Sequence, residues 1–393
     1  MGKKWMLEAV FFGAAICMAS CVRVQMVQQL PYQTSTEPHA LAQGLGPKSL
    51  ALVSEPPAGL TLPALQSEKP LFAKWPSPLV KNGYLWIALD CLTREGSYDR
   101  LWIDSNDDGR LSDEAELVPF TSGSTWARFG PIQVRPVDGK APIKCPMVFS
   151  FAGGRESPRL SVASVGWYEG TIVVDGKEKQ CVLVDQNANG TFDDRSIDFE
   201  NCDLIQIVDK PEASIWITGN FIQVDEKLYR LEVARDGTSI SLASARAVNY
   251  GTVRVPNEIT ELVVGGENGL LEVKTKNGVA RLPVGKYRVY QWVLERKDQT
   301  GDTWSAKGWS KGNPEVFEVS KGSTAKLSLG EPLLSSVDIR NPANNEDVIV
   351  YGLRGTSGEL VQLNRNGVAL RAPGIHIQNA DGSYDRIFTY SYG

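Results

Sequence analysis

Short runs of alternating apolar and polar residues, or of β-branched residues, dominate the chain after residue 70. Examples are "YLWIALD" at 84–90, "MVFSF" at 147–151, "YRLEVA" at 229–234 and "SISLA" at 239–243. A period of two turns alternate side chains toward one face, as in a half-buried strand. Gly, Asp, Asn and Pro separate the runs, and helical periodicity is scarce. We therefore predict a mainly β, multi-domain chain of hairpin-rich units followed by β-sandwich domains.

Two stretches predict tight hairpins, "VVDGKEKQCVLVD" at 173–185 and "VARDGTSISL" at 233–242. Each has Asp-Gly between two apolar runs, and Gly tolerates the positive φ of a primed turn. A third stretch, "VARLPVGKYRVYQWVLER", resembles the turn and core strand of prealbumin-like or carboxypeptidase-regulatory sandwiches of secreted proteins. Its simple alternation sets Tyr287, Val289 and Gln291 on the face opposite Arg288, Tyr290 and Trp292.

Changes in composition divide the chain into five segments, with one boundary near Ala247. Residues 22–70 are rich in Gln, Pro, Ser and Thr with little periodicity, which is typical of a flexible tether. The predicted segments are a signal at 1–21, the tether at 22–70, a β domain at 71–247, a prealbumin-like sandwich at 248–332 and a small Ig-like β unit at 333–393.

The N-terminus has the pattern of an export signal. Two lysines precede an apolar stretch at 9–20 and then Cys21. The stretch is too short for a relaxed membrane span of about 20 residues. The sequence "MASC" resembles the lipobox of bacterial lipoproteins, with Met18 in place of the usual Leu. That resemblance implies lipid on Cys21 and a membrane-anchored, extracytoplasmic protein. An ordinary cleaved signal and a short membrane anchor are the alternatives.

Four cysteines remain beyond the signal and Cys21. In an exported protein this number suits two disulfides, and we expect Cys181–Cys202 and Cys91–Cys145 among the three possible pairings. Four buried thiols are the alternative. The net charge of −5 gives no basic field for nucleic acid.

Two acidic stretches carry the strongest functional pattern, "DSNDDGRLSDEAE" at 104–116 and "DQNANGTFDDRSID" at 185–198. Both resemble positions 1 to 9 of the EF-hand calcium loop, although a strand rather than a helix precedes each. Asp or Asn at positions 1, 3 and 5 can direct oxygens at one ion, Gly at 6 permits the turn, and position 7 offers its carbonyl. The resemblance gives as ligands Asp104, Asn106, Asp108, Arg110 by its carbonyl and Ser112, and in the second stretch Asp185, Asn187, Asn189, Thr191 by its carbonyl and Asp193.

The bidentate Glu of position 12 is missing, since Ala115 and Ser196 stand there. Glu114 or Glu116 could replace it in the first stretch, and Asp194 or Asp198 in the second. We expect calcium sites with a dissociation constant of about 10⁻⁴–10⁻³ M, because few charged ligands are present. Magnesium is less suited, since it requires strict octahedral geometry. The alternative is a polar turn capped by Asp and Asn.

No residue pattern marks a catalytic centre. The two histidines are His39 and His376, and G-x-S-x-G, H-E-x-x-H and P-loop motifs are absent from the sequence. The overall layout resembles uncharacterised bacterial lipoproteins in which EF-hand-like loops precede prealbumin- or Ig-like sandwiches, and this resemblance brings no known activity with it. We expect a non-enzymatic, calcium-binding β scaffold with a structural or partner-binding role.

Two other functions stay open. A surface protein that binds a carbohydrate, the cell wall or a cell-surface protein could use the aromatic residues Tyr287, Tyr290, Trp292, Trp304 and Trp309. Strands dense in aromatics, however, usually form a core. A carboxylate-dependent hydrolase is the third hypothesis.

Overall fold

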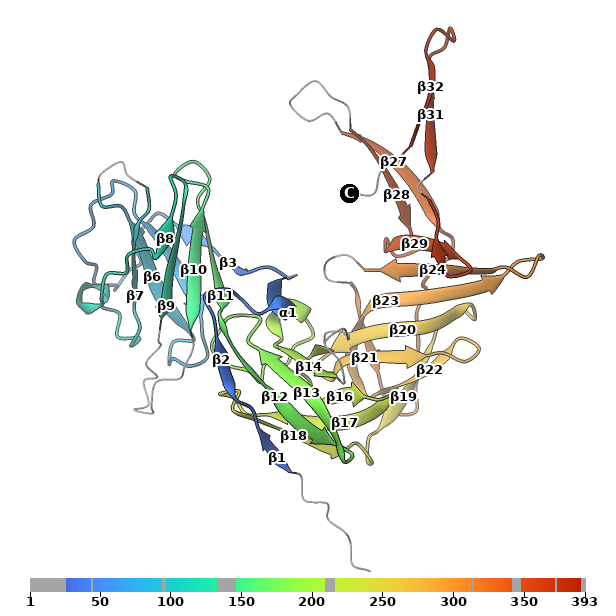
Figure 1. Ribbon diagram of the computed structural model, residues 1–393, viewed down its shortest axis with the longest axis horizontal. Helices are drawn as coiled ribbons and strands as arrows, with labels where there is room; N and C mark the ends of the chain where they lie inside the picture. Colours follow the sequence, from blue (N-terminus) through green and yellow to red (C-terminus); the bar gives the residue numbers. More distant parts are fainter. Residues whose placement is uncertain are drawn as a thin grey trace, which may run out of the picture.

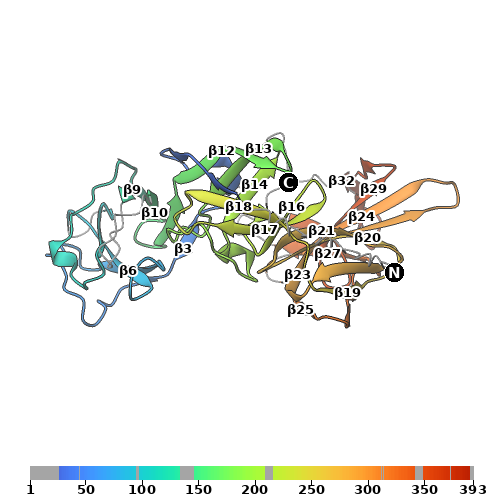
Figure 2. The same cartoon turned by 90° about the horizontal axis from the view of Figure 1, so that it is seen from below.

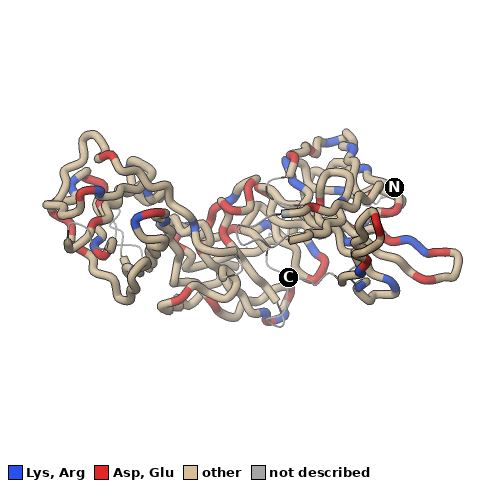
Figure 3. Tube along the Cα trace, turned by 90° about the horizontal axis from the view of Figure 1, so that it is seen from above, with Lys and Arg blue, Asp and Glu red and all other residues tan. Residues whose placement is uncertain are grey.

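Antiparallel β-sheet makes up nearly all of the described chain, which confirms the predicted mainly β, multi-domain class. The computed structural model describes residues 26–43, 45–93, 97–132, 146–208, 216–310, 312, 314–340, 348–371 and 373–389. Three sandwich-like units follow one another along the long axis (Figures 1 and 2). Acidic and basic residues are interspersed along all three units (Figure 3).

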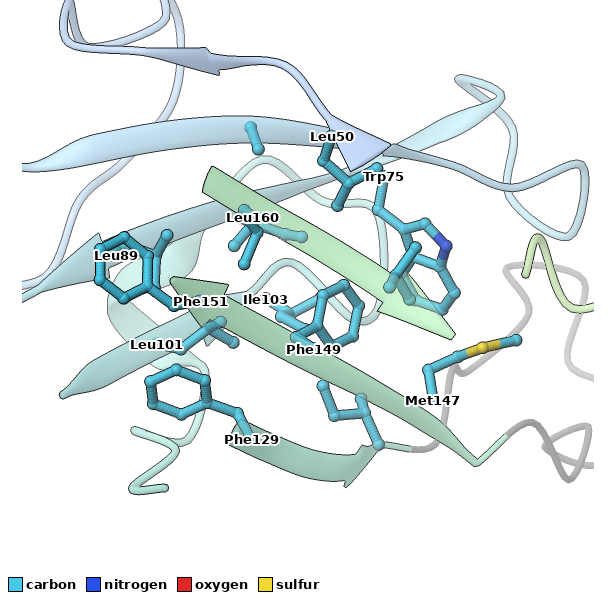
Figure 4. Packing of buried hydrophobic residues seen from close by; sticks show 14 of the residues in the cluster. Leu50, Trp75, Leu89, Leu101, Ile103, Phe129, Met147, Phe149, Phe151 and Leu160 are labelled. Carbon is cyan, nitrogen blue, oxygen red and sulfur yellow. The ribbon is translucent and has the colours of Figure 1, made fainter. Parts of the chain in front are cut away.

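The first unit, sandwich 1, joins two sheets over an aromatic core. One sheet has the order β4(Leu52–Val53)-β5(Leu71–Pro76)-β6(Tyr84–Asp90)-β7(Arg100–Ile103). The other has the order β3(Lys48–Leu50)-β11(Arg159–Ser164)-β10(Met147–Ala152)-β9(Trp126–Ile132)-β8(Thr121–Ser122). Figure 4 shows Trp75, Phe129, Phe149 and Phe151 between the sheets, and all four are at most 2% exposed.

Sandwich 2 includes both predicted hairpins. Its sheets are β15(Trp216–Ile217)-β14(Leu204–Val208)-β13(Lys177–Val184)-β12(Gly166–Val174)-β2(Tyr32–Thr34) and β1(Val27–Gln29)-β18(Ser239–Ser244)-β17(Lys227–Val233)-β16(Phe221–Val224). Asp175 and Gly176 join β12 to β13 with φ values of 50° and 81°, which confirms the primed turn. The β17–β18 hairpin is also present.

Sandwich 3 has a core around Tyr287 and Trp292, both fully buried. A three-stranded sheet, β22(Val279–Pro283)-β19(Tyr250–Arg254)-β26(Thr324–Lys326), faces a nine-stranded sheet. The nine-stranded sheet has the order β21(Gly269–Lys274)-β20(Ile259–Gly266)-β23(Gly285–Lys297)-β24(Thr303–Trp309)-β29(Leu360–Arg365)-β28(Val348–Arg354)-β27(Leu334–Arg340), with β25(Val316–Val319) and β30(Val368–Ala369) attached.

The described residues after 333 continue sandwich 3 before they leave it. The β24–β29 pairing joins strands from the two sides of the boundary expected at residue 333. The β27–β28 hairpin and a separate hairpin, β31(Gly374–Gln378)–β32(Asp385–Thr389), extend away from the body (Figure 1).

Residues 26–70 differ from the expected flexible tether. β1 pairs with β18, β2 with β12, β3 with β11 and β4 with β5. A four-residue helix, α1(Ala40–Gln43), lies between β2 and β3, and Ala42 is buried with Val184 and Leu204. These strands are only two or three residues long, so the sequence shows no periodicity. Residues 22–25 and 44 of the tether segment lie outside the described residues.

Candidate metal-binding loops

We call residues 104–116 loop 1 and residues 185–198 loop 2. Asp104 directly follows β7, and its carboxylate accepts the backbone N–H of Asp108 at 3.0 Å and that of Gly109 at 3.0 Å. Asp107 and Gly109 have φ values of 58° and 79°, so the chain turns sharply around the carboxylate. Asp104 is 2% exposed, and burial raises its pKa above the usual range.

Two further predicted ligands of loop 1 turn toward the same backbone. Asn106 Oδ1 accepts the N–H of Asp108 at 3.1 Å, and Asp108 Oδ1 accepts the N–H of Arg110 at 2.9 Å. The Arg110 side chain points away and pairs with Asp113 at 3.2 Å. Ser112, the ligand expected at position 9, is exposed on the short helix η1(Leu111–Asp113). It is therefore not grouped with the side chains of the other predicted ligands.

Loop 2 repeats these hydrogen bonds one for one. Asp185 accepts the N–H of Asn189 at 3.1 Å and that of Gly190 at 2.8 Å. Asn187 Oδ1 accepts the N–H of Asn189 at 3.1 Å, and Asn189 Oδ1 accepts the N–H of Thr191 at 2.9 Å. The repeat detected in the sequence is therefore also a repeat of backbone conformation. The structure brings the first three predicted side chains of each loop together.

Loop 2 is far more buried than loop 1. Asp185 and Thr191 are each 1% exposed, whereas Asn106 and Asp108 lie at the surface. Burial raises the pKa of Asp185 well above its usual range, and the neighbouring Asp194 raises it further. Asp193, the ligand expected at position 9, is half-buried, and its pKa is raised by burial and then by Asp194.

The structure distinguishes between the substitutes proposed for the missing twelfth ligand. Glu116 pairs with Arg100 at 2.6 Å, and Asp198 pairs with Arg288 at 2.9 Å. In contrast, Glu114 accepts the N–H of Ser105 at 2.7 Å, inside loop 1.

Asp194 likewise lies against its own loop. It accepts the Asn189 amide at 2.9 Å and the Thr191 hydroxyl at 2.7 Å. Glu114 and Asp194 are therefore the better-placed candidates for the twelfth ligand. Each hydrogen-bonds within its own loop, whereas Glu116 and Asp198 pair with arginines.

Sequence reasoning missed Asp203, a fully buried residue just before β14. Its Oδ2 accepts the N–H of Asp194 at 2.9 Å. Burial raises the pKa of Asp203 well above the usual range, and the charges of Asp185 and Asp194 add to that effect. The β13–β14 pairing brings Asp203 next to the start of loop 2. A search for ligands within one loop does not include Asp203, because it lies beyond the end of loop 2.

The donor atoms of both loops are oxygens, which suits a hard cation such as calcium. Each carboxylate oxygen that accepts one N–H keeps a second lone pair for an ion. Within the described ranges, no group of three or more His, Cys, Asp and Glu side chains is placed to hold a metal ion. Such a group is not required here, since Asn side chains and backbone carbonyls supply much of an EF-hand-like shell.

The predicted Cys181–Cys202 disulfide is wrong, because both thiols are free and buried. Alternation along β13 directs Cys181 into the core of sandwich 2, whereas Val182 and Val184 point to the opposite face, where Cys202 packs. The two sulfurs therefore lie on opposite faces of one sheet. Cys145, the expected partner of Cys91, lies outside the described residues, as do Cys21 and the signal.

The aromatic residues considered for a sugar platform do not form one surface. Tyr287 and Trp292 are core residues of sandwich 3. The Trp304 indole donates to Asp298 at 2.9 Å, and the ring of Trp309 faces the amine of Lys307 at 5.5 Å.

Comparison with protein-family models, curated proteins and solved structures finds no match for this chain. Among the described residues, no helix has the length and apolar character needed to cross a membrane.

Proposed function

We propose that this chain is an exported, lipid-anchored β scaffold in which loops 1 and 2 bind calcium and stiffen the fold. The observation that carries the proposal is a turn repeated in both loops, in which the carboxylates of Asp104 and Asp185 each accept two backbone N–H groups. The side-chain oxygens at positions 3 and 5 accept N–H groups of the same turn in both loops. The two loops share this arrangement although loop 1 is much more exposed than loop 2. This supports a common ligand over a turn that arose by chance. No catalytic step is part of the proposal, and a cell-surface protein or polysaccharide is the proposed partner class.

Calcium would act on stability in this role. A ligand that binds only the folded state adds RT ln(1 + [L]/Kd) to the free energy of unfolding, about 1.4 kcal/mol per site at a tenfold excess. The described residues bury five separate hydrophobic clusters rather than one continuous core, so increments of this size are significant.

Calcium titration of the metal-stripped protein tests this proposal. We expect heat of binding and a rise in melting temperature at millimolar calcium, with Asp104→Ala and Asp185→Ala each removing one part of the response. Asp236→Ala, in the exposed β17–β18 turn, is the matched control. A flat titration in the wild-type protein would leave the loops as capped turns and contradict the proposal.

The anchor is tested separately. We expect radioactive fatty acid to label the protein in bacterial cells, and Cys21→Ser to abolish both the label and recovery in the membrane fraction. Unchanged labelling of Cys21→Ser would reject the anchor and leave the calcium proposal standing.

A further inference from the structure

Two carboxylates oppose each other at the entrance to loop 2. β13 and β14 are antiparallel, with Val184 opposite Leu204. Asp185 directly follows β13 and Asp203 directly precedes β14, so the register continued by one residue sets the two acids across from each other. Like charges in directly opposed positions destabilise a strand pair, and both side chains are at most 1% exposed.

Asp203 has an oxygen without a partner. Oδ1 is buried, and no described residue donates a hydrogen bond to it, although Oδ2 accepts the N–H of Asp194. The β13–β14 register sets this carboxyl opposite Asp185, at the start of loop 2. A buried carboxylate oxygen without a hydrogen bond is costly, and a bound cation would satisfy it.

Space for water lies beside Asp185. A cavity of about 180 Å³ borders Asp185 and Gln186, and it is also lined by Ala42 and Ser164. Gln186 Oε1 is buried and has no partner among the described residues. Since calcium commonly keeps water among its six to eight oxygens, such a cavity could supply the remaining ligands.

Loop 2 contacts all three sandwiches. In sandwich 1, the indole of Trp75 donates to the Ala188 carbonyl at 2.7 Å, and the Ser77 hydroxyl donates to the Asn189 carbonyl at 2.7 Å. In sandwich 2, the ring of Phe192 lies 5.1 Å from that of Tyr168.

Contacts with sandwich 3 come from the end of the loop and the residue after it. Asp198 pairs with Arg288 at 2.9 Å, and the ring of Phe199 lies 5.9 Å from that of Tyr290. Loop 2 therefore lies where the three units meet.

We propose that Asp203 and Asp185 share one divalent cation, calcium by its ligand chemistry, and that this ion fixes loop 2 as the joint between the three sandwiches. The amide oxygens of Asn187 and Asn189 and the carbonyl of Thr191 complete the protein ligands, and Asp194 positions Asn189 and Thr191 by its hydrogen bonds. The inference rests on calcium binding by loop 2 and adds a ligand that the EF-hand pattern lacks.

Asp203→Asn tests the shared ion in the full-length protein. The amide is isosteric and neutral, so without calcium it removes the repulsion from Asp185 and we expect a higher melting temperature than in the wild type. With calcium, we expect affinity at this site to fall at least about tenfold, because ligand charge sets affinity. Calorimetry should then count one ion instead of two. Glu200→Gln makes the same charge change at an exposed position of the short helix that follows loop 2, η2(Phe199–Asn201), and should behave as wild type.

The outcomes separate this inference from calcium binding itself. Two ions bound with unchanged affinity in Asp203→Asn would remove Asp203 from the ligands while leaving the proposed function intact. A lower melting temperature in both conditions, with binding unchanged, would make Asp203 a purely structural residue and also overturn the inference. No calcium bound to the wild type would overturn both proposals.

Hydrogen exchange and small-angle scattering test the joint. We expect calcium to slow exchange at residues 186–203 and also in β5 and at the start of β23, which contact loop 2, and to reduce the maximum dimension of the protein. Asp203→Asn should lose these effects, whereas Asp104→Ala should keep them. Slower exchange confined to loop 2, with scattering unchanged, would reduce the ion to a local ligand and reject the joint.

Discussion

At the scale of single residues, the same spacing yields two turns of similar conformation in different surroundings. Asp104 and Asp185 each accept two N–H groups from residues four and five positions later, a local arrangement that the sequence predicts directly. Both aspartates are buried, but the loops around them differ, because sandwich 1 contacts loop 2 through Trp75 whereas Asn106 and Asp108 of loop 1 are exposed. Local hydrogen bonds are therefore predictable, while burial depends on residues more than 100 positions away.

Trp75 provides the clearest test of this burial. Its indole N–H donates to the Ala188 carbonyl across the junction of sandwiches 1 and 2. In Trp75→Phe this buried carbonyl loses its donor, which costs about 1–3 kcal/mol before any loss of packing. We expect urea unfolding in the presence of a chelator to show that decrease in the free energy of unfolding.

Trp126→Phe is the matched control, since Trp126 belongs to the same sandwich and is 42% exposed. We expect it to change the free energy of unfolding by less than about 0.5 kcal/mol, as surface substitutions usually do. Equal losses in the two variants would show that the hydrogen bond to Ala188 contributes nothing beyond packing.

At the scale of elements, patterns within one strand or turn were predictable and irregular pairings were not. The Asp175–Gly176 turn follows from residue chemistry alone. The expected alternation along β23 fails because the register with β20 shifts between Val263 and Val264, leaving Tyr290 unpaired as a bulge. After the bulge Trp292, rather than Gln291, points into the core.

The candidate metal site shows the same division. Positions 1, 3 and 5 of each loop came from spacing within one stretch of sequence. Asp203 could not be found this way, because it reaches Asp185 only through the β13–β14 register and lies beyond the end of loop 2. The disulfide prediction failed for the related reason that strand alternation separates Cys181 from Cys202.

At the scale of the whole molecule, the N-terminal segment was predicted from its composition to be a tether, but it pairs with the sheets of two sandwiches. β1 and β2 lie on opposite sheets of sandwich 2, with Leu30 between them in its core, 5% exposed. β3 and β4 then pair with the two sheets of sandwich 1. A polar composition with two- and three-residue strands gives no periodic signal, so this strap is visible only in the assembled structure.

Truncation distinguishes a strap from a tether. Removing residues 1–25 should leave the melting temperature unchanged, since it takes away none of the described pairings. Removing residues 1–35 uncovers the edges of β12 and β18 and deletes Leu30, whose burial alone contributes about 1.5–3 kcal/mol. We expect a lower melting temperature and, because exposed strand edges recruit further strands, association in sedimentation velocity. Leu30→Ala in the longer chain separates the two effects: it should lower stability without association, because both strand edges stay covered. Equal stability of the two truncated proteins would instead mean that the segment rests on the surface as a tether does.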